Sequence, residues 1–207
     1  VEGGAGQVPA REAQVFIGNA GTAARFLPVL MSLGQGDYEL DGVPRMRERP
    51  IGPLLEALAE LGAGVRAKHD DGRVPLIVEA RGVEGGRVRI PGNLSSQYIT
   101  GLLLGGPYMR QGLELEVDGE LVSRPYVEMT LAAMRAFGVE GQREEWRRFR
   151  VAPGRYTACR YPVEPDASAA SYFFGAAAIT GGEVTVEGLG RGSLQGDLDL
   201  VHLLEQM

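Results

Sequence analysis

The chain has 207 residues, of which 44% are hydrophobic and 23% charged, a balance typical of a globular protein with a sizeable core. A net charge of −6 without Lys/Arg runs argues against binding to nucleic acid or an anionic membrane. A lone Cys159 and two distant histidines argue against a disulfide framework or a Cys/His metal centre, and no stretch approaches the roughly 18 apolar residues that cross a bilayer. We therefore expect a cytoplasmic protein that works without a metal or a cofactor.

The chain contains an internal repeat, whose copies span residues 18–65, 91–141 and 164–207. Each copy opens on an Asn or Asp followed by small or hydroxyl residues and an apolar run, a pattern typical of a helix N-cap and first turn. These opening residues are Asn19, Asn93 and Asp166. An alternating apolar stretch then predicts a half-buried strand that ends at an acid–Gly turn. The predicted strands are Tyr38–Leu40, Leu113–Val117 and Val184–Val186.

A second amphipathic helix follows the turn in the first two copies, and a glycine (Gly62 or Gly138) closes each of these helices. The apolar positions are Ile51, Leu54, Leu55, Leu58 and Leu61 in the first copy, and Tyr126, Met129, Leu131, Met134 and Phe137 in the second. Short strands complete the copies, at Leu76–Val78, Val88–Ile90 and Phe149–Val151. The repeat predicts an α/β scaffold of supersecondary units, each with two helices and a small sheet.

The start of the first helix, residues 18–25, has the chemistry of an anion site. Its small residues let the backbone approach an anion, Thr22 offers a hydroxyl, and Arg25 adds a guanidinium one turn inside the helix. Close helix packing explains the glycines and alanines almost equally well.

Arg45, Arg47 and Arg49 alternate just before a helix that Pro50 can initiate. In an extended segment they would share one side, which suits a phosphate or carboxylate target. The alternative is a surface charge cluster that Glu48 neutralises.

Two further helix starts carry polar groups, Ser95-Ser96-Gln97 behind Asn93 and Ser123-Arg124-Pro125-Tyr126. Hydroxyls, an amide and free backbone N–H groups suit a phosphorylated, polyhydroxylated ligand, although N-capping alone would require only one serine. Four such helix starts together favour a phosphate-rich substrate. The sequence has neither a P-loop nor a Gly-x-Ser-x-Gly elbow.

GNAGTAAR, PRMRERPIG, SSQ, SRPY, DASAASYF and SLQGD, in this order, resemble the motifs of the EPSP synthase family of enolpyruvyl transferases. The resemblance implies an α/β (α+β) fold of repeated βαβαββ units, an inside-out α/β barrel that is partial here. The chain resembles an internal fragment without either terminus. Residues 1–163 would form part of the first globular domain, with two of its three units and a remnant. Residues 164–207 would cross the hinge near Glu164 and begin the second domain.

The resemblance also implies an activity, the transfer of the enolpyruvyl (1-carboxyvinyl) group from phosphoenolpyruvate to the 5-hydroxyl of shikimate 3-phosphate. The products are EPSP and phosphate, in aromatic amino-acid (chorismate) biosynthesis. Matched motif by motif, the phosphoenolpyruvate contacts are Gly21, Arg49 and Gln97. The expected contacts of shikimate 3-phosphate, direct or supporting, are Thr22, Arg25, Ser95, Ser96, Gln97, Ser123 and Tyr126. Asp166 matches a family acid near the hinge and the second domain.

The principal acid/base residues of the family fall outside the matched motifs, so we expect no catalytic residue in this chain and no turnover by the fragment alone. When complete, the protein is expected to be a monomer with two small-molecule substrates. Two alternatives stay open. One is a UDP-N-acetylglucosamine enolpyruvyl transferase, which shares the fold, and the other is a non-catalytic phospho-ligand binding module. Pro165 departs from the family, which usually has glycine between the two acids at the hinge.

Overall fold

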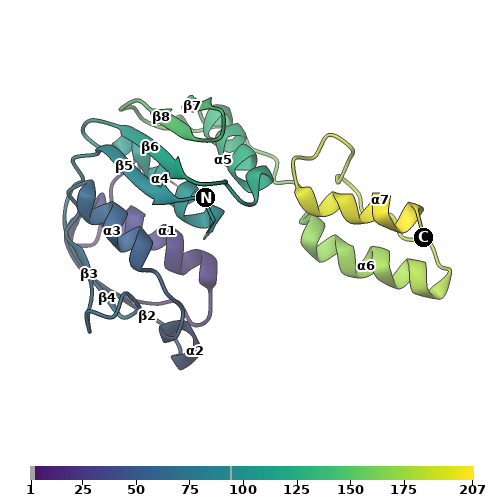
Figure 1. The fold of residues 1–207 in the computed structure, drawn as a ribbon, viewed down its shortest axis with the longest axis horizontal. Coiled ribbons are helices and arrows are strands. Elements are labelled where there is room, and N and C mark those ends of the chain that lie inside the picture. Colours follow the sequence, from purple (N-terminus) through teal and green to yellow (C-terminus); the bar gives the residue numbers. More distant parts are fainter. Residues whose placement is uncertain (1–2, 94) are drawn as a thin grey trace. The chain divides into compact units, whose positions relative to one another are not determined.

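A computed structural model of the chain describes residues 3–93 and 95–207 and shows two compact units, Val1–Ala158 and Cys159–Met207 (Figure 1). The first unit ends at Ala158. The hinge predicted from the sequence lies a few residues later, near Glu164. The assignment of the units to enzyme domains stays a prediction. None of the helices in the described residues is long and apolar enough to cross a membrane.

The first copy of the repeat folds into helices over one four-stranded sheet of order β1-β2-β4-β3. Strand β1 pairs with β2 in parallel, whereas the β2–β4 and β3–β4 pairs are antiparallel. The alternation in β2 buries Tyr38 and Leu40 and leaves Glu39 on the outer face, as the sequence predicts. The elements are β1 (Glu12–Phe16), α1 (Gly21–Ser32), β2 (Gln35–Asp41), α2 (Pro44–Arg47), α3 (Gly52–Glu60), β3 (Val65–Ala67) and β4 (Leu76–Arg81).

The second copy repeats this topology in a sheet of order β5-β6-β8-β7, with β5 parallel to β6 and the other pairs antiparallel. The predicted strand Val88–Ile90 therefore opens the second copy, which begins before residue 91, and does not complete the first. The βαβαββ order of both copies confirms the predicted fold class. Gly62 and Gly138 follow α3 and α5 with positive φ values of 85° and 82°, as expected of glycines that end helices. The elements are β5 (Gly86–Pro91), α4 (Ser96–Gly105), η1 (Gly106–Tyr108), β6 (Leu113–Asp118), α5 (Arg124–Ala136), β7 (Gly141–Glu144) and β8 (Arg148–Val151).

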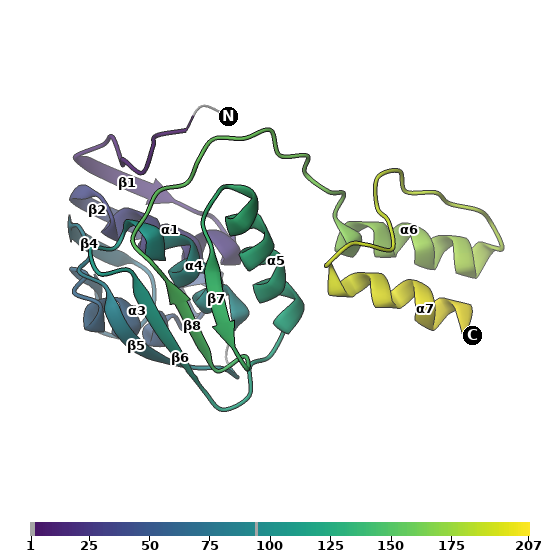
Figure 2. The same cartoon turned by 90° about the horizontal axis from the view of Figure 1, so that it is seen from above.

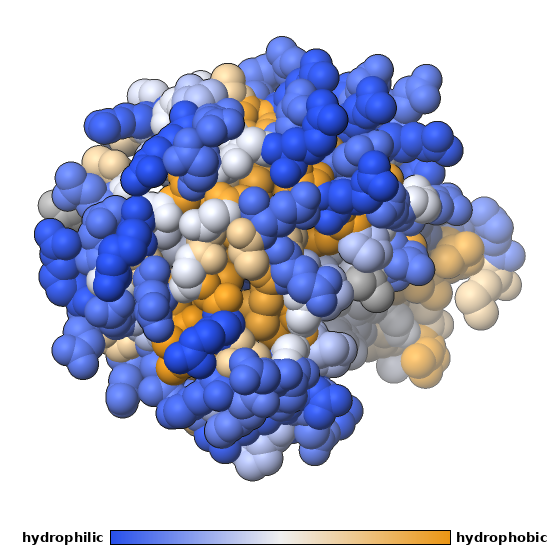
Figure 3. All heavy atoms as spheres, turned by 60° about the vertical axis from the view of Figure 1, so that its left-hand side comes forward, coloured by the Kyte–Doolittle hydropathy of each residue, from blue (hydrophilic) through white to orange (hydrophobic). Residues whose placement is uncertain are grey.

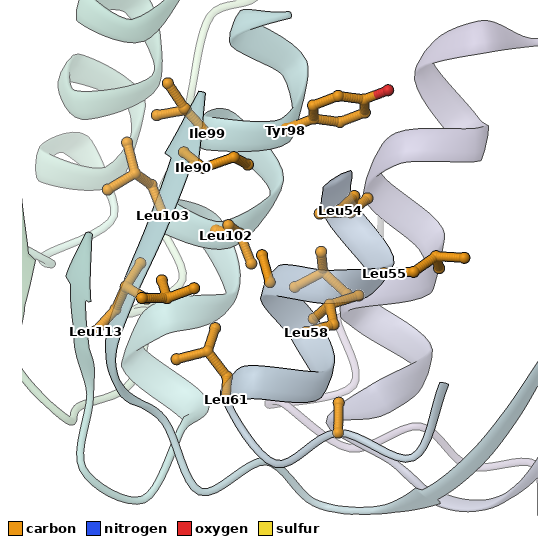
Figure 4. Packing of buried hydrophobic residues seen from close by; sticks show 14 of the residues in the cluster. Leu54, Leu55, Leu58, Leu61, Ile90, Tyr98, Ile99, Leu102, Leu103 and Leu113 are labelled. Carbon is orange, nitrogen blue, oxygen red and sulfur yellow. The ribbon is translucent and has the colours of Figure 1, made fainter. Parts of the chain in front are cut away.

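The two copies share one hydrophobic core, which lies between the sheets (Figures 1 and 2). Figure 4 shows members of this core from four elements: leucines of α3, Ile99, Leu102 and Leu103 of α4, Ile90 of β5 and Leu113 of β6. Leu54, Leu58, Leu102 and Leu103 are each 0% exposed. The outer faces of the sheets carry ion pairs such as Arg87–Glu114 and Arg89–Glu116. Figure 3 shows the result, with hydrophilic residues over most of the surface and hydrophobic ones in a strip near its middle.

Two of the three predicted helix caps are wrong. Ala20 precedes α1 without a side-chain cap, and Ser95 caps α4, whereas Asn19 and Asn93 lie in the turns before these helices. The Ala20 amide donates to the Ile17 carbonyl at 3.0 Å, so a tight turn occupies Asn19 before the helix begins.

The buried face of α5 also differs from the prediction. It consists of Val127, Thr130, Leu131 and Met134, while Tyr126 is 47% exposed. Tyr126 lies at the entrance of the helix, next to Pro125 and after Ser123, whose φ is 56°. Thr130 can be buried because its hydroxyl is fully hydrogen-bonded within the helix pair.

The second unit contains two helices, α6 (Ala167–Thr180) and α7 (Asp199–Glu205), and the short η2 (Gly196–Leu198). Asp166 caps α6 as predicted, because its carboxylate accepts the Ser168 and Ala169 amides at 2.8 and 3.2 Å. The Gln195 side chain holds the entrance of α6, since it donates to the Pro165 carbonyl and accepts the Ala167 amide, both at 2.7 Å.

The predicted strand Val184–Val186 is wrong, because these residues adopt no regular structure. A strand needs a neighbour for its backbone N–H and C=O groups, and none of the described residues of this unit pairs with it.

Candidate functional site

Helices α1 and α4 lie in parallel, with their N-termini side by side. The side-chain amide of Gln97 donates from Nε2 to the Thr22 hydroxyl at 3.2 Å. Further along the pair, Gly101 faces Arg25 and Gly105 faces Val29. These contacts advance in the same direction on both helices in steps of about one turn. A Cβ at Gly105 would lie 2.6 Å from Val29, so glycine is what allows this close approach. Thr22 and Gln97 are thereby brought together at the two helix starts.

Helix α5 begins on the same side of the unit. Strands β5 and β6 are parallel, and α4 and α5 follow one strand each, so both helices start at the carboxyl edge of the sheet. The Thr100 and Thr130 hydroxyls join the two helices at 2.8 Å, about one turn behind each entrance. The polar starts 95–97 and 123–126 therefore belong to neighbouring helix entrances.

Of the three alternating arginines, only Arg49 faces this site. The segment is not extended as predicted, because Pro44–Arg47 forms the short helix α2, which turns the side chains apart. Arg45 pairs with Glu48, and Arg47 pairs with Asp41. The Arg49 guanidinium lies against Gly21 at the start of α1, where a Cβ would be only 2.5 Å from it. Arg49 is exposed and has no ion pair with any residue that the structure describes, so its charge can bind an external anion.

Neighbouring charges set the electrostatics of this region. The hydrogen bond from Arg47 holds the pKa of Asp41 below its ordinary value, more strongly than partial burial raises it. An ionised Asp41 neutralises Arg47. Arg49 is then the exposed cation next to two helix N-termini, whose free N–H groups also favour an anion. No cluster of three or more His, Cys, Asp or Glu residues able to hold a metal exists within the described ranges.

Arg25 supports the start of α1 from inside. It is 7% exposed, and its Nη1 donates to the Gly21 carbonyl at 2.9 Å. Its Nε has no hydrogen-bond partner among residues 3–93 and 95–207. Arg25 therefore fixes the turn that presents Gly21 and Thr22.

The two serines before Gln97 have different surroundings. The Ser95 hydroxyl accepts a hydrogen bond from the backbone amide of Gln97 at 3.2 Å and caps the helix, whereas Ser96 is buried, with 7% exposure. The N-cap alternative thus holds for Ser95. Ser123 is exposed at the entrance of α5 and makes no side-chain cap. Asp166 belongs to the second unit, where it caps α6.

Sequence reasoning missed Thr100, Thr130 and the glycines at 101 and 105. Thr100 and Thr130 each stand four residues after a predicted site residue, Ser96 and Tyr126, which places them one turn deeper on the same helix. The spacing of the glycines is a signal for close helix packing. These two patterns could have indicated which helices pair.

The chain is thus an α/β protein of βαβαββ units in which polar helix N-termini and the exposed Arg49 lie together. A sequence model of one family, EPSP synthase (3-phosphoshikimate 1-carboxyvinyltransferase), matches residues 1–207, and the chain belongs to this family.

Relatives named 3-phosphoshikimate 1-carboxyvinyltransferase match the whole chain. The protein of Shewanella denitrificans is 48% identical over 210 residues, and that of Nostoc is 46% identical over 208; the match covers 49% of each relative. The chain thus spans about half the length of these curated relatives. A solved EPSP synthase from Acinetobacter baumannii, 25% identical, superposes with a TM-score of 0.74 over 94% of this chain and 43% of that one. A second structure from the same organism gives a TM-score of 0.75 at 26% identity, with 94% and 42% covered.

Proposed function

We propose that this chain forms part of an enzyme that transfers the enolpyruvyl group of phosphoenolpyruvate to the 5-hydroxyl of shikimate 3-phosphate. In this reaction a proton adds to the methylene carbon of phosphoenolpyruvate, and the hydroxyl oxygen attacks the neighbouring carbon as its own proton passes to a base. The resulting tetrahedral intermediate expels phosphate and loses the methyl proton to give EPSP. We further propose that the protein acts in the cytoplasm as a monomer.

The observation that carries the proposal is the position of Arg49. Its guanidinium touches Gly21 at the start of α1, and Gln97 is held at the neighbouring helix start by Thr22. A phosphoenolpyruvate anion at this point would meet one cation, one amide donor and two sets of free helix N–H groups. These groups lower the barrier by orienting the substrate and by stabilising negative charge on its carboxylate and phosphate.

Shikimate 3-phosphate fits the adjoining entrance of α5. Ser123 and Tyr126 are exposed there, and α4 brings Ser95, Ser96 and Gln97 alongside. This division of residues, with the phosphoenolpyruvate at Arg49 and the sugar-like acid at Ser123, follows the family motifs. The names of the relatives favour shikimate 3-phosphate over UDP-N-acetylglucosamine as the acceptor.

Arg49→Ala in the full-length protein tests the proposal, with Arg45→Ala as a matched control. Arg45 comes from the same exposed segment but is already paired with Glu48. We expect Arg49→Ala to reduce kcat/KM for phosphoenolpyruvate by the equivalent of about 2–5 kcal/mol, the usual effect of truncating one partner of a desolvated charge pair. The affinity for shikimate 3-phosphate should change little, and Arg45→Ala should be close to wild type.

Steady-state kinetics in both substrates measure these effects. Equal losses in the two variants would remove Arg49 from the site, and a wild-type protein that binds shikimate 3-phosphate without turnover would instead identify a binding module. Saturable binding of UDP-N-acetylglucosamine, without binding of shikimate 3-phosphate, would reassign the acceptor.

A further inference from the structure

Two buried hydroxyls connect the helices whose starts form the proposed acceptor site. Thr100 of α4 is 9% exposed and Thr130 of α5 is 6% exposed, and their Oγ1 atoms lie 2.8 Å apart. Thr130 Oγ1 also lies 2.8 Å from the Tyr126 carbonyl oxygen.

The chemistry of these groups fixes the direction of both hydrogen bonds. A carbonyl oxygen only accepts, so Thr130 uses its single proton to donate to Tyr126. Thr130 must then accept from Thr100, which gives one ordered chain from Thr100 through Thr130 to Tyr126. All of these groups are satisfied only when the two helices keep one spacing and one register, because hydrogen bonds weaken steeply when they are stretched or bent.

This chain of hydrogen bonds ends in the first turn of α5. Tyr126 is the residue whose carbonyl accepts the last bond, and Thr100 lies one turn behind Ser96 on α4. The hydrocarbon contacts around the pair provide attraction, but they are not directional and do not define a register by themselves.

We infer that Thr100 and Thr130 are positioning residues that hold the 95–97 and 123–126 helix starts at the spacing required by shikimate 3-phosphate. The inference rests on the proposed function. Both hydroxyls are buried and bonded within the helix pair, so they act through the placement of Ser95, Ser96, Ser123 and Tyr126.

The test uses the full-length protein with three variants and a matched control. Thr130→Val removes the hydroxyl at nearly constant shape, and Thr130→Ser keeps it. The double variant Thr100→Val and Thr130→Val removes both partners, so no buried hydroxyl is left unsatisfied. The control is Ser32→Ala, because Ser32 is 1% exposed and its hydroxyl donates to the Pro28 carbonyl at 2.7 Å within α1, away from the helix pair.

For Thr130→Val we expect the KM for shikimate 3-phosphate to rise about five- to tenfold, the equivalent of one lost hydrogen bond. The KM for phosphoenolpyruvate and kcat should stay within about twofold, and Thr130→Ser should restore the wild-type KM. Thr130→Val should also lower Tm, because it leaves Thr100 without an acceptor.

The double variant separates positioning from simple stability. Its Tm should recover towards wild type, since replacing both partners by apolar groups of similar shape is nearly neutral, while its KM for shikimate 3-phosphate should remain raised. Ser32→Ala should lower Tm without changing either KM. A KM that follows Tm through the whole series, or one that stays unchanged in Thr130→Val, would overturn the inference.

Gln97→Ala distinguishes an error in the positioning role from an error in the proposed function. If Gln97→Ala impairs the enzyme and Thr130→Val does not, only the positioning role is wrong. If the wild-type protein neither turns over nor binds shikimate 3-phosphate, the proposed function falls and the positioning role falls with it.

Discussion

Helices α4 and α6 open the second and third copies of the repeat, and a side chain caps each of them, Ser95 in one and Asp166 in the other. Their surroundings differ. Helix α4 buries residues on all sides, including Leu102 and Leu103 at 0% exposure, whereas α6 buries only Ala167 and Ala170. Similar local sequence therefore forms a helix in both units, but within these 207 residues only α4 is packed in a core. The comparison separates what a helix gains from its own residues from what it gains from packing.

The largest expected difference concerns buried leucines. Leu102→Ala in α4 should cost about 2–5 kcal/mol of unfolding free energy, because it leaves a cavity in the shared core. Ile179→Ala in α6, where the side chain is 88% exposed, should change stability by no more than about 0.5 kcal/mol. Urea unfolding followed by the fluorescence of Trp146, the single tryptophan, measures the first, and amide exchange in α6 measures the second. Similar losses of unfolding free energy at both positions would show that α4 gains no more stability from packing than α6 does.

Replacing glycine by alanine should lower stability in α4 and raise it in α6. Gly105→Ala would place a Cβ 2.6 Å from Val29 Cγ1, so we expect a loss of about 1–3 kcal/mol as α1 and α4 are forced apart. At Gly175 in α6 a Cβ would meet nothing within 4 Å. Gly175→Ala should therefore stabilise the helix by about 0.5–1 kcal/mol, since alanine restricts the unfolded chain.

Thermal unfolding measures the Gly105 variant, and the exchange rate of α6 amides measures the Gly175 variant. A stabilising Gly105→Ala would show that the close approach of α1 and α4 is not required.

Capping changes should have the same effect in both units, because a cap is a local interaction. Ser95→Ala and Asp166→Ala each remove a side chain that accepts backbone N–H groups of the first turn. We expect each to cost about 1 kcal/mol of helix stability. Protection of the first-turn amides against exchange measures both. A negligible effect at Asp166 alone would mean that Gln195 suffices to hold the start of α6.

Acid should weaken the first unit modestly through Asp41. The Arg47 hydrogen bond lowers the pKa of this carboxyl in the folded state, so its contribution to stability is present above the ordinary aspartate value of about 3.9. The contribution is lost as the pH falls through that value towards the lower, folded pKa. Urea midpoints from Trp146 fluorescence at about pH 5 and below measure this loss. In the variant Arg47→Gln the loss of stability in acid should be smaller. An identical pH dependence in this variant would exclude the Arg47–Asp41 pair as the cause of the loss.

Much of the first unit is predictable from the sequence, because its signals are periodic or local. Apolar and polar residues alternate in β2 and β6, which predicts both strands. The spacing of the leucines in α3 predicts its buried face, and Gly62 and Gly138 indicate where two helices end. The family motifs also indicate Gly21, Arg49 and Gln97. The structure brings the first two into contact and places Gln97 on Thr22. The roles of these residues towards substrates stay predictions.

The failed predictions depend on partners distant in the sequence. Val184–Val186 alternates as a strand should, yet no described neighbour in its unit accepts or donates its ladder bonds. Arg45 and Arg49 look equivalent in the sequence, yet one is neutralised by Glu48 and the other faces Gly21.

The repeat, the class of fold and the chemistry available at each helix start can be derived from the sequence, since these depend on residue type and on spacing along the chain. Which helix starts meet, and which of the three alternating arginines stays unpaired, emerges only from the folded chain. The tertiary structure also decided that Thr100 and Thr130 share one buried hydrogen bond across thirty positions of sequence. The physical reason is that distances between helices follow from how two sheets enclose a common core, and that geometry is not periodic in any one segment.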